Sequence, residues 1–446
     1  MRHELLFGVI LTAATFQTFA ADPPHPGRSA NKGQATAERA ADSDAGTSAS
    51  DDFLDDEGWR RLPEADRKSR MRRMILSRYE PLGKADPARI SQYIQKFQQM
   101  NVYDPRVYLF HVTARLDPAT TGNVVLSGEV NVAQFRSGLE STLSSLGFTV
   151  TANNIQVLPA KEPGLKIYGL STTTAATLRK EPRERSEQVN SVSMGGWVRL
   201  LRHATADDLT TTVFGRHHSP SSGTAINEPP NQWYLAQSLE GYLGYVRKGD
   251  LKLYDDFTVP DGLVEVPTEA VAAGKKVAVP AGALVYKHGD SWELFEGGIL
   301  PKSARVHSLE PHIAANDIKA SMKPFMDTKY VWGGTTDHGI DCSGFTQFFL
   351  RLRGASVPRD AEEQATSGFI VAWGDDIAKK AKPGDIIFFT SESGRISHVA
   401  ISLGGNDIIH SAGEGVHFSK LSDARHGNPD DTLLEGAIFA RRIIVR

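Results

Sequence analysis

The 446-residue chain contains a single cysteine, Cys342, within the stretch YVWGGTTDHGIDCSGF that runs from Tyr330 to Phe345. A lone cysteine has no partner in the chain for a disulfide, so its thiol is either buried and inert or reactive. Four glycines and the polar neighbours Asp341 and Ser343 are typical of an exposed turn rather than a core. The stretch therefore favours a reactive thiol, whose chemistry would be attack on an acyl carbon.

A helix is expected to begin at or just after Cys342. Four apolar side chains in the run Phe345–Leu352 recur at i, i+3, i+4 and i+7, which makes one apolar face, and Gly354 would stop the helix. The thiol would then lie at the first turn, where free backbone N–H groups and the helix dipole stabilise a thiolate. The same N–H groups are suited to receive an oxyanion.

Two histidines downstream are candidates for the base that such a nucleophile needs. The runs HVAISLG and NDIIHSAG read as strands of a hairpin that turns at Gly404 and Gly405. His398 and His410 would then lie nearly opposite each other, to within about one register step. One imidazole would take the thiol proton and the other would hold its tautomer. A lone histidine on a strand is usually structural, and this interpretation is kept for the other histidines, His417 among them.

The start of the chain indicates export. Residues 1–20 combine a short polar start, the apolar run Leu5–Phe16 and small residues before Ala21, which is typical of a removed secretory signal. The apolar run is short for a membrane span, and a retained N-terminal anchor is the alternative. Residues 21–58 are poor in large apolar side chains and are expected to be a disordered linker. In an oxidising compartment structural cysteines usually come in pairs, so an unpaired cysteine again favours reactivity.

Composition sets further limits on the class of protein. Hydrophobic residues make up 40% and charged residues 23% of the chain, which is ordinary for globular domains and suggests about three of them. The net charge of −3 gives no electrostatic case for nucleic acid as a partner. No later segment is apolar enough to cross a membrane.

An α+β multidomain protein is expected, with the chemistry at its C-terminal end. Residues 59–160 combine a basic helical run, interpreted as a solvated helix face, with a small α+β pattern. Short strands and glycine turns make residues 161–255 and 256–312 similar to two small bacterial SH3-like β-barrels, and residues 313–446 hold Cys342. Aromatic side chains are expected in the barrel cores, with one ligand-facing tyrosine as the alternative: Trp233, Tyr242, Tyr245 and Trp292.

Several motifs of the C-terminal part occur in a set order. Tyr330 precedes Cys342 of DCSGF by twelve residues, and the motifs PRD, Gln364, KPGDIIFF, SHVAI and IIHSAG follow. This arrangement is very similar to that of the NlpC/P60 cell-wall cysteine peptidases. The two SH3-like modules ahead of it further resemble the subgroup that cleaves between γ-D-glutamyl and a diamino acid in murein peptides.

The resemblance implies a compact papain-like domain, in which the helix of Cys342 packs on an antiparallel sheet that carries both histidines. It makes Cys342 the nucleophile, His398 the general base and His410 the orienting third residue. It also implies a set of residues that assist the oxyanion or hold the substrate: Tyr330, Asp341, Ser343, Arg359 and Asp360. Ala361 stands where several relatives place a serine, which puts one polar substrate contact in doubt.

Asp341 has two candidate roles. A buried carboxylate suits the free amine of a short stem peptide that begins with L-Ala. The alternative is the N-cap of the helix, which needs no substrate, and both roles are compatible.

The expected function is a cysteine endopeptidase that hydrolyses the γ-D-glutamyl-diaminopimelate bond of murein stem peptides. One alternative is an amidase or acyl transferase of the related CHAP type, against which His410 speaks, since Asn, Asp or Glu is more usual there. A catalytically idle scaffold that binds the cell wall is another. Peptidoglycan fragments are the expected partners, with no metal or cofactor, and the periplasm is the expected location, with secretion beyond it as the alternative. The sequence does not indicate an oligomeric state.

Overall fold

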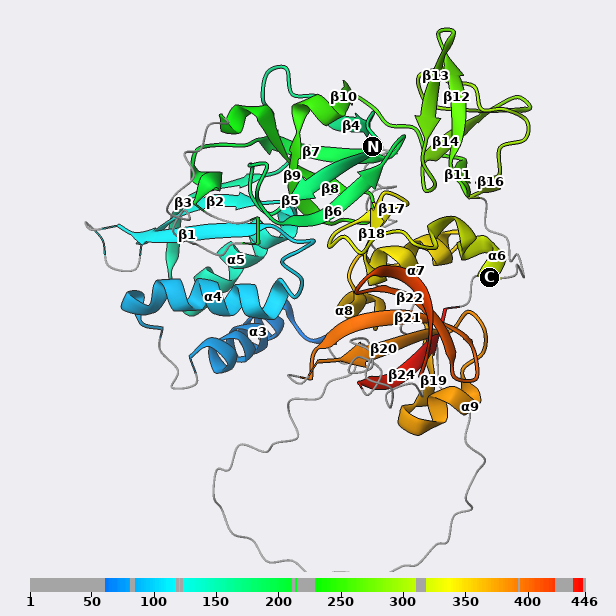
Figure 1. Ribbon diagram of the computed structural model, residues 1–446. Helices are drawn as coiled ribbons and strands as arrows, with labels where there is room; N and C mark the ends of the chain where they lie inside the picture. The colour runs from blue at the N-terminus through cyan, green and yellow to red at the C-terminus, as the bar shows by residue number, and fades with distance from the viewer. Residues whose placement is uncertain are drawn as a thin grey trace, which may run out of the picture.

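A computed structural model describes residues 61–80, 85–117, 120, 123–210, 213–214, 229–309, 318–391, 394–421 and 436–443 (Figure 1). The predicted signal at 1–20 and the predicted linker at 21–58 lie outside these residues. None of the helices among the described residues is both long enough and apolar enough to span a membrane.

The N-terminal unit is a three-stranded sheet with helices packed on it. Strand β2 pairs antiparallel with β1 and parallel with β3, and α5 makes the crossover between β2 and β3. Its elements are α3 (Glu64–Tyr79), η1 (Pro87–Arg89), α4 (Ile90–Asn101), β1 (Phe110–Leu116), β2 (Asn123–Val130), α5 (Ala133–Leu146) and β3 (Thr149–Val157). The four apolar residues at helical spacing in α4 are buried in its core.

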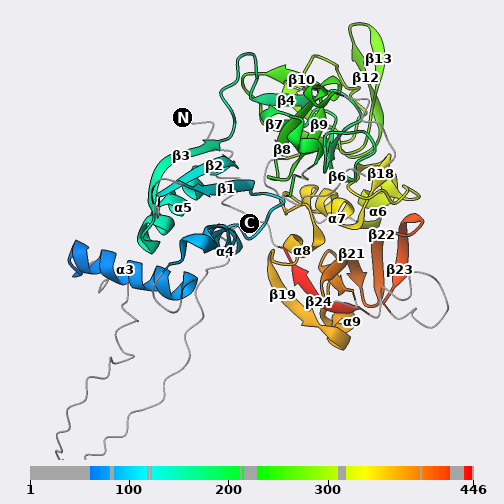
Figure 2. The ribbon, with the colours of Figure 1, turned by 90° about the vertical axis from the view of Figure 1, so that its left-hand side faces the viewer.

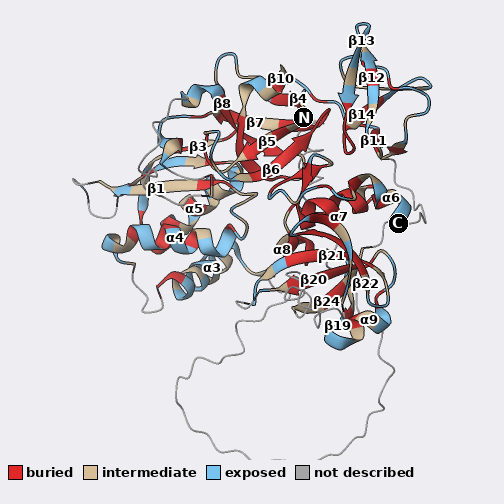
Figure 3. Ribbon diagram, viewed as in Figure 1, coloured by how far each residue is buried: buried red, intermediate tan, exposed pale blue. Residues whose placement is uncertain are grey.

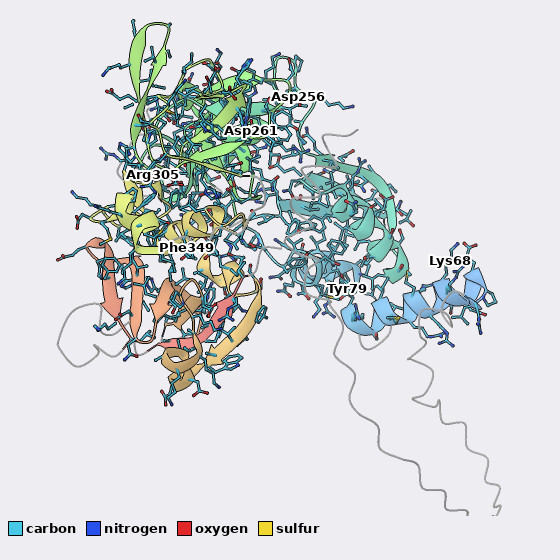
Figure 4. All side chains as sticks on the ribbon, turned by 90° about the vertical axis from the view of Figure 1, so that its right-hand side faces the viewer. Lys68, Tyr79, Asp256, Asp261, Arg305 and Phe349 are labelled. Atoms are coloured by element: carbon cyan, nitrogen blue, oxygen red, sulfur yellow. The ribbon has the colours of Figure 1, made fainter. Side chains whose placement is uncertain are left out.

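The basic run of this unit forms helix α3, of which only Tyr79 is buried. Figure 4 shows Lys68 on the part of α3 that lies far from the C-terminal unit. Its side chain is 76% exposed and pairs with Glu64 one turn away at 2.7 Å. The prediction of a solvated helix face is therefore confirmed.

The second unit is a seven-stranded antiparallel sheet in the order β10-β4-β7-β8-β9-β5-β6. Its elements are β4 (Tyr168–Ser171), β5 (Ala175–Arg179), β6 (Gln188–Ser193), β7 (Trp197–His203), η2 (Asp207–Leu209), η3 (Pro230–Gln232), β8 (Trp233–Ser238), β9 (Leu243–Arg247), η4 (Lys248–Asp250) and β10 (Leu251–Tyr254). Trp233, Tyr242 and Tyr245 are buried, as expected. In this strand order β6 and β10 are the two edges of the sheet, and no pairing between them is found among the described residues. The predicted closed SH3-like barrel is therefore not confirmed.

The third unit is smaller. A four-stranded sheet has the order β15-β14-β11-β16, and a two-stranded hairpin, β12-β13, projects away from the rest (Figure 1). Its strands are β11 (Gly262–Val264), β12 (Thr268–Ala272), β13 (Lys275–Val279), β14 (Leu284–His288), β15 (Ser291–Glu293) and β16 (Val306–Ser308). Trp292 packs against the core of this unit but is only half-buried.

The C-terminal unit packs a buried helix on an antiparallel sheet of order β19-β24-β20-β21-β22-β23. Its elements are α6 (Ile318–Met322), η5 (Lys323–Phe325), β17 (Thr335–Thr336), β18 (Gly339–Ile340), α7 (Cys342–Arg351), α8 (Ala361–Gln364), β19 (Phe369–Trp373), η6 (Gly374–Asp376), α9 (Ile377–Lys380), β20 (Ile386–Thr390), β21 (Ile396–Gly404), β22 (Asp407–Ala412), β23 (Gly415–Lys420) and β24 (Ala437–Arg442). Figure 3 shows α7 and the middle of the sheet as the most buried part of this unit.

The packing of α7 follows from its sequence. Phe345, Phe348 and Phe349 are buried in one core with Val399 and Ile401 of β21, as the apolar periodicity predicts. Helix α7 thereby rests on β21 and β22, the strands that carry the two candidate histidines.

Two of the preceding units contact the C-terminal unit near the start of α7. Strand β6 lies beside β17 in Figure 1, and Figure 2 shows β6 next to β18 and above α7. The Ser191 hydroxyl lies 2.8 Å from that of Thr335. The loop between α4 and β1 also reaches the C-terminal unit, since the Arg106 side chain donates to the Asp360 carboxylate at 2.9 Å. Residues from the second unit and the N-terminal unit are therefore available to line a site at α7.

Candidate active site

Cys342 is the first residue of α7 and is 6% exposed. Asp341 is the N-cap, and its carboxylate accepts from the backbone N–H of Gly344 at 2.7 Å. The backbone N–H groups of Val399 and Ser343 lie near the thiol and lower its pKa, and the Tyr330 side chain lies beside it. The predicted position at a helix start is confirmed, with β21 directly beside the sulfur.

The electrostatics of Cys342 differ from the sequence prediction of a stabilised thiolate. Burial, together with the neighbouring Asp341 carboxylate, raises the pKa of the thiol to about 12. The backbone N–H groups and Arg359 lower the pKa, but by less than burial raises it. The prediction from the helix dipole alone was wrong in direction because it did not account for removal of the sulfur from water. At neutral pH the resting cysteine is a thiol.

His398 and His410 are brought together by the hairpin of β21 and β22, with Gly404 paired to Asp407 at its turn. The Nε2 atom of His398 lies 2.7 Å from Nδ1 of His410, and both rings are buried. The pairing of Ile401 with Ile409 makes the two histidines diagonal neighbours on the strands, so they are further from direct opposition than predicted.

Both imidazoles are neutral at pH 7. Burial lowers the pKa of His398 to about 4, although the Asp341 charge raises it in part. Burial also lowers the pKa of His410 well below its usual value, and the neighbouring His398 and His417 lower it further. A neutral imidazole beside a thiol is able to act as a general base.

Asp341 is fully engaged by protein groups. It accepts from the backbone N–H of Gly333 at 2.8 Å, from Gly344 and from the Ser343 hydroxyl at 3.3 Å. The guanidinium of Arg359 donates to both carboxylate oxygens, at 3.0 and 2.7 Å. Since every acceptor site of Asp341 has a partner, the structure favours the N-cap role over recognition of a substrate amine.

Arg359 is a buried cation that ties the second unit to the start of α7. Its Nε donates to the Asn190 side chain of β6 at 2.8 Å, and its Nη1 donates to the Ser343 hydroxyl at 2.9 Å. The Asp341 carboxylate raises its pKa despite burial, so the ion pair persists. The predicted substrate roles of Ser343 and Arg359 remain predictions, but the contacts described here are structural.

Glycines allow the start of α7 to approach the preceding loop. A Cβ at Gly344 would lie 2.4 Å from the carbonyl oxygen of Gly334. Gly333 has φ of 73°, and a Cβ there would lie 2.9 Å from the Gln188 carbonyl of β6. The glycine-rich pattern around Cys342 thus reflects tight backbone packing. The predicted exposed turn was wrong, because Asp341, Cys342 and Ser343 are all buried.

Asp360 lies where three units meet. Its carboxylate accepts from Arg106 of the N-terminal unit at 2.9 Å and from the Tyr242 hydroxyl at 3.1 Å. Arg106 also pairs with Glu363 and lies 3.7 Å from Glu362. Ala361, the departure from the expected pattern, is buried in the first turn of α8.

Three residues in this region were missed or were given another role by sequence reasoning. Arg106 and Asn190 carry no motif, and only tertiary contacts bring them to residues 341–360. Tyr242 was assigned to the barrel core, and it is indeed buried, but its hydroxyl also donates to Asp360 of the C-terminal unit. Among the described residues no group of three His, Cys, Asp or Glu side chains is arranged to hold a metal ion.

Comparison with known proteins identifies this region. Residues 327–428 match the model of the NlpC/P60 family. The chain is similar to the gamma-D-glutamyl-L-lysine dipeptidyl-peptidases of Bacillus cereus, 36% identical over 103 residues, and Bacillus subtilis, 39% identical over 110 residues. These matches cover 23% and 24% of this chain and 29% and 36% of the two relatives, so the chain spans about a third of their length.

Two solved structures are also similar. An NlpC/P60 family protein from Bacillus cereus aligns with a TM-score of 0.48 and 19% identity, over 62% of this chain and 99% of that one. An NlpC/P60 endopeptidase from Photobacterium damselae subsp. piscicida aligns with a TM-score of 0.47 and 12% identity, over 86% of this chain and 93% of that one. The family match over residues 327–428 confirms the predicted NlpC/P60 domain at the C-terminal end.

Proposed function

Because residues 327–428 form an NlpC/P60 domain, from a family of cysteine peptidases, we propose that the protein is an exported endopeptidase that cleaves the γ-D-glutamyl-diamino acid bond of peptidoglycan stem peptides. One observation carries this proposal. Cys342 begins α7, which packs on β21 and β22, and within that hairpin Nε2 of His398 lies 2.7 Å from Nδ1 of His410. The helix start that carries the nucleophile is thus packed on the two strands that carry a base and an orienting group.

The reaction starts from a neutral pair. As Cys342 Sγ attacks the scissile carbonyl carbon, its proton passes to His398 Nδ1, the ring nitrogen that His410 does not engage. The C–N bond then breaks, and the imidazolium gives this proton to the leaving amine, which leaves a thioester. Water hydrolyses the thioester with His398 again as base, and the thiol is restored.

The oxyanion of the tetrahedral intermediate would form beside the start of α7. Free backbone N–H groups of a helix start stabilise such a charge. Tyr330 would assist, since its side chain lies beside the thiol and burial raises its pKa, which keeps its hydroxyl protonated.

The preference for a free N-terminal L-Ala is better assigned to Asp360 than to Asp341. Both oxygens of Asp341 are taken, whereas Asp360 shares one guanidinium, that of Arg106, with two further carboxylates, Glu362 and Glu363. The hydrogen bonds that Asp360 accepts from Arg106 and Tyr242 both fall on Oδ2, so we assign its Oδ1 to a peptide ammonium group.

The two β units before the NlpC/P60 domain are proposed to be SH3-like modules over residues 161–255 and 256–312, and the domain itself to extend over 313–446. Their antiparallel strands and buried aromatic residues support this assignment. Asn190 and Tyr242 come from the first of them and contact Arg359 and Asp360, so this module would form one wall of the substrate site. Residues 59–160 would contribute Arg106.

The test uses synthetic L-Ala-γ-D-Glu-diaminopimelate peptides, with a free or an acetylated N-terminus, and mass spectrometry of the products. Cleavage of the D-Glu-diaminopimelate bond in the free peptide is expected, with little turnover of the acetylated one. Cys342→Ala is expected to abolish cleavage, whereas His288→Gln, at a side chain 86% exposed in the third unit, leaves it unchanged.

Other outcomes separate the alternatives. Equal turnover of the acetylated peptide would remove the amine preference. In a parallel assay on a muropeptide that retains muramic acid, cleavage of the bond between muramic acid and L-Ala would instead indicate a CHAP-type amidase. Binding to murein without cleavage of any peptide would indicate an idle scaffold.

A further inference from the structure

A third histidine lies next to the His398–His410 pair. His417 of β23 is the direct partner of His410 in the β22–β23 ladder, and their ring centroids lie 4.7 Å apart at an angle of 55°. Strand β22 lies between β21 and β23, so His410 has His398 on one side and His417 on the other. This position raises the question of what His417 does for the pair.

The proton of His417 is fixed by its backbone contact. Its Nδ1 lies 2.9 Å from the carbonyl oxygen of Gly415. A carbonyl only accepts, so Nδ1 carries the hydrogen and, in the neutral ring, Nε2 has the lone pair.

One hydrogen lies between His398 Nε2 and His410 Nδ1. Which of these two nitrogens carries it determines whether His398 is able to act as a base. In the first arrangement His398 Nε2 donates to His410 Nδ1, which leaves His398 Nδ1 free to take the thiol proton. In the second, His410 Nδ1 donates, the neutral His398 must carry its hydrogen on Nδ1, and it cannot accept a proton there. Only the first arrangement supports the proposed function.

The first arrangement places the hydrogen of His410 on Nε2. This atom is buried and has no hydrogen-bond partner among the described residues. The two nitrogens of an imidazole point in diverging directions, so Nε2 points away from His398, and the ring of His417 lies on the side of His410 opposite to β21. A neutral imidazole offers an N–H group both a lone pair and a π face.

We propose that His417 is a positioning residue, which favours the Nε2–H tautomer of His410 and so keeps His398 Nδ1 unprotonated towards Cys342. This inference rests on the proposed function, since it deepens the role of the same pair. Burial lowers the pKa of both His398 and His410, so at pH 7 each ring carries one proton, as a choice between tautomers requires.

The direct test is ¹⁵N NMR of the full protein with labelled histidines at pH 7, because protonated and unprotonated ring nitrogens have well separated shifts. His398→Gln and His410→Gln spectra assign the two rings. The expected result is a hydrogen on Nε2 of both His398 and His410. A hydrogen on Nδ1 of His410 would overturn the inference.

A second test compares variants at position 417. His417→Phe keeps an aromatic ring but removes both nitrogens, so a mixture of His410 tautomers and a decrease in kcat of about tenfold are expected, with KM within twofold. His417→Gln, which retains a carbonyl acceptor, should recover part of the kcat. His288→Phe is the matched control and should leave kcat and the tautomers unchanged.

The outcomes distinguish this inference from the proposed function. A His417→Phe variant with wild-type tautomers and a kcat within twofold of wild type would contradict the positioning role. If this variant does not fold, His417→Gln and the wild-type spectrum still test the inference, because NMR reports the tautomers of His410 independently of enzyme activity. Failure of the wild-type protein to cleave any peptide would refute the proposed function, whatever the NMR result.

Discussion

Replacement of Arg359 by Met tests whether the buried ion pair with Asp341 holds the start of α7. The side chains of the pair are 1% and 8% exposed, and Arg359 makes two of the hydrogen bonds to Asp341. Met has a similar length, so the main loss is the charge partner of a buried carboxylate. Removing one member of a buried pair typically costs about 3–5 kcal/mol.

The remaining donors to Asp341 set the magnitude. Gly333, Gly344 and Ser343 still hydrogen-bond the carboxylate in the variant, so a loss near the middle of the range, about 4 kcal/mol, is expected in the free energy of local opening. Since about 1.4 kcal/mol corresponds to a factor of ten, amide exchange in α7 should become roughly a thousandfold faster.

Hydrogen exchange followed by mass spectrometry measures this effect on peptides that cover residues 342–351 of the full-length protein. A local measurement is needed because a multidomain chain need not unfold in one step. The matched control is Arg395→Met in the same domain, because Arg395 is 72% exposed and its contact with Glu362 is at the surface. This change should alter exchange in α7 little, since exposed pairs contribute about 0–1 kcal/mol.

A double variant separates the unpaired charge from simple loss of contacts. Asp341→Asn still offers an oxygen to cap the helix, so the combination with Arg359→Met should be less destabilised than Arg359→Met alone. If α7 exchanged within threefold of wild type in Arg359→Met, or if the double variant were more labile than the single one, the buried pair would not have the role described here.

Three further outcomes are expected. Because burial lowers the pKa of His398 to about 4 and a base must be unprotonated, kcat/KM should persist down to about pH 4–5. The stability of the fold should decrease as pH falls from about 6.5 towards 4, because the unfolded histidine binds a proton in this range and the buried one does not. An acid limb near pH 6.5 in the profile of kcat/KM against pH would contradict the prediction. Gly344→Ala should lower kcat for peptide turnover at least tenfold, because the added Cβ would push α7 away from the loop that holds Gly334. The control Gly249→Ala should leave kcat unchanged, since a Cβ there meets nothing within 4 Å. Arg106→Ala should lower KM for the free-amine peptide several-fold, since it removes the cation that competes for Asp360; an unchanged or higher KM would argue against an amine site there.

Local pattern was sufficient for the parts of the site that depend on neighbours in the chain. The apolar spacing from Phe345 to Leu352 placed Cys342 at a helix start, because helix periodicity is a local property. The glycine turn likewise brought His398 and His410 to adjacent strands, although β-bulges and the diagonal register were not readable. The order of motifs was enough to identify the NlpC/P60 domain.

Contacts between distant segments were not predictable in the same way. The pairing of β10 with β4 joins strands about eighty residues apart. Such long-range pairing gives the second unit a strand order with two edges, β10 and β6, and the short-range sequence pattern does not encode it. Arg106 reached Asp360 across 254 residues for the same reason.

The sequence by itself determined which residues could do chemistry, since one cysteine and two histidines in a hairpin are matters of residue type and local spacing. Tertiary structure alone decided their protonation and their partners. Burial outweighs the helix dipole at Cys342 and makes it a neutral thiol, and the approach of Arg359 gives Asp341 a structural role. The physical reason is that desolvation and ion pairing depend on everything packed around a group, and that packing is a property of the whole fold.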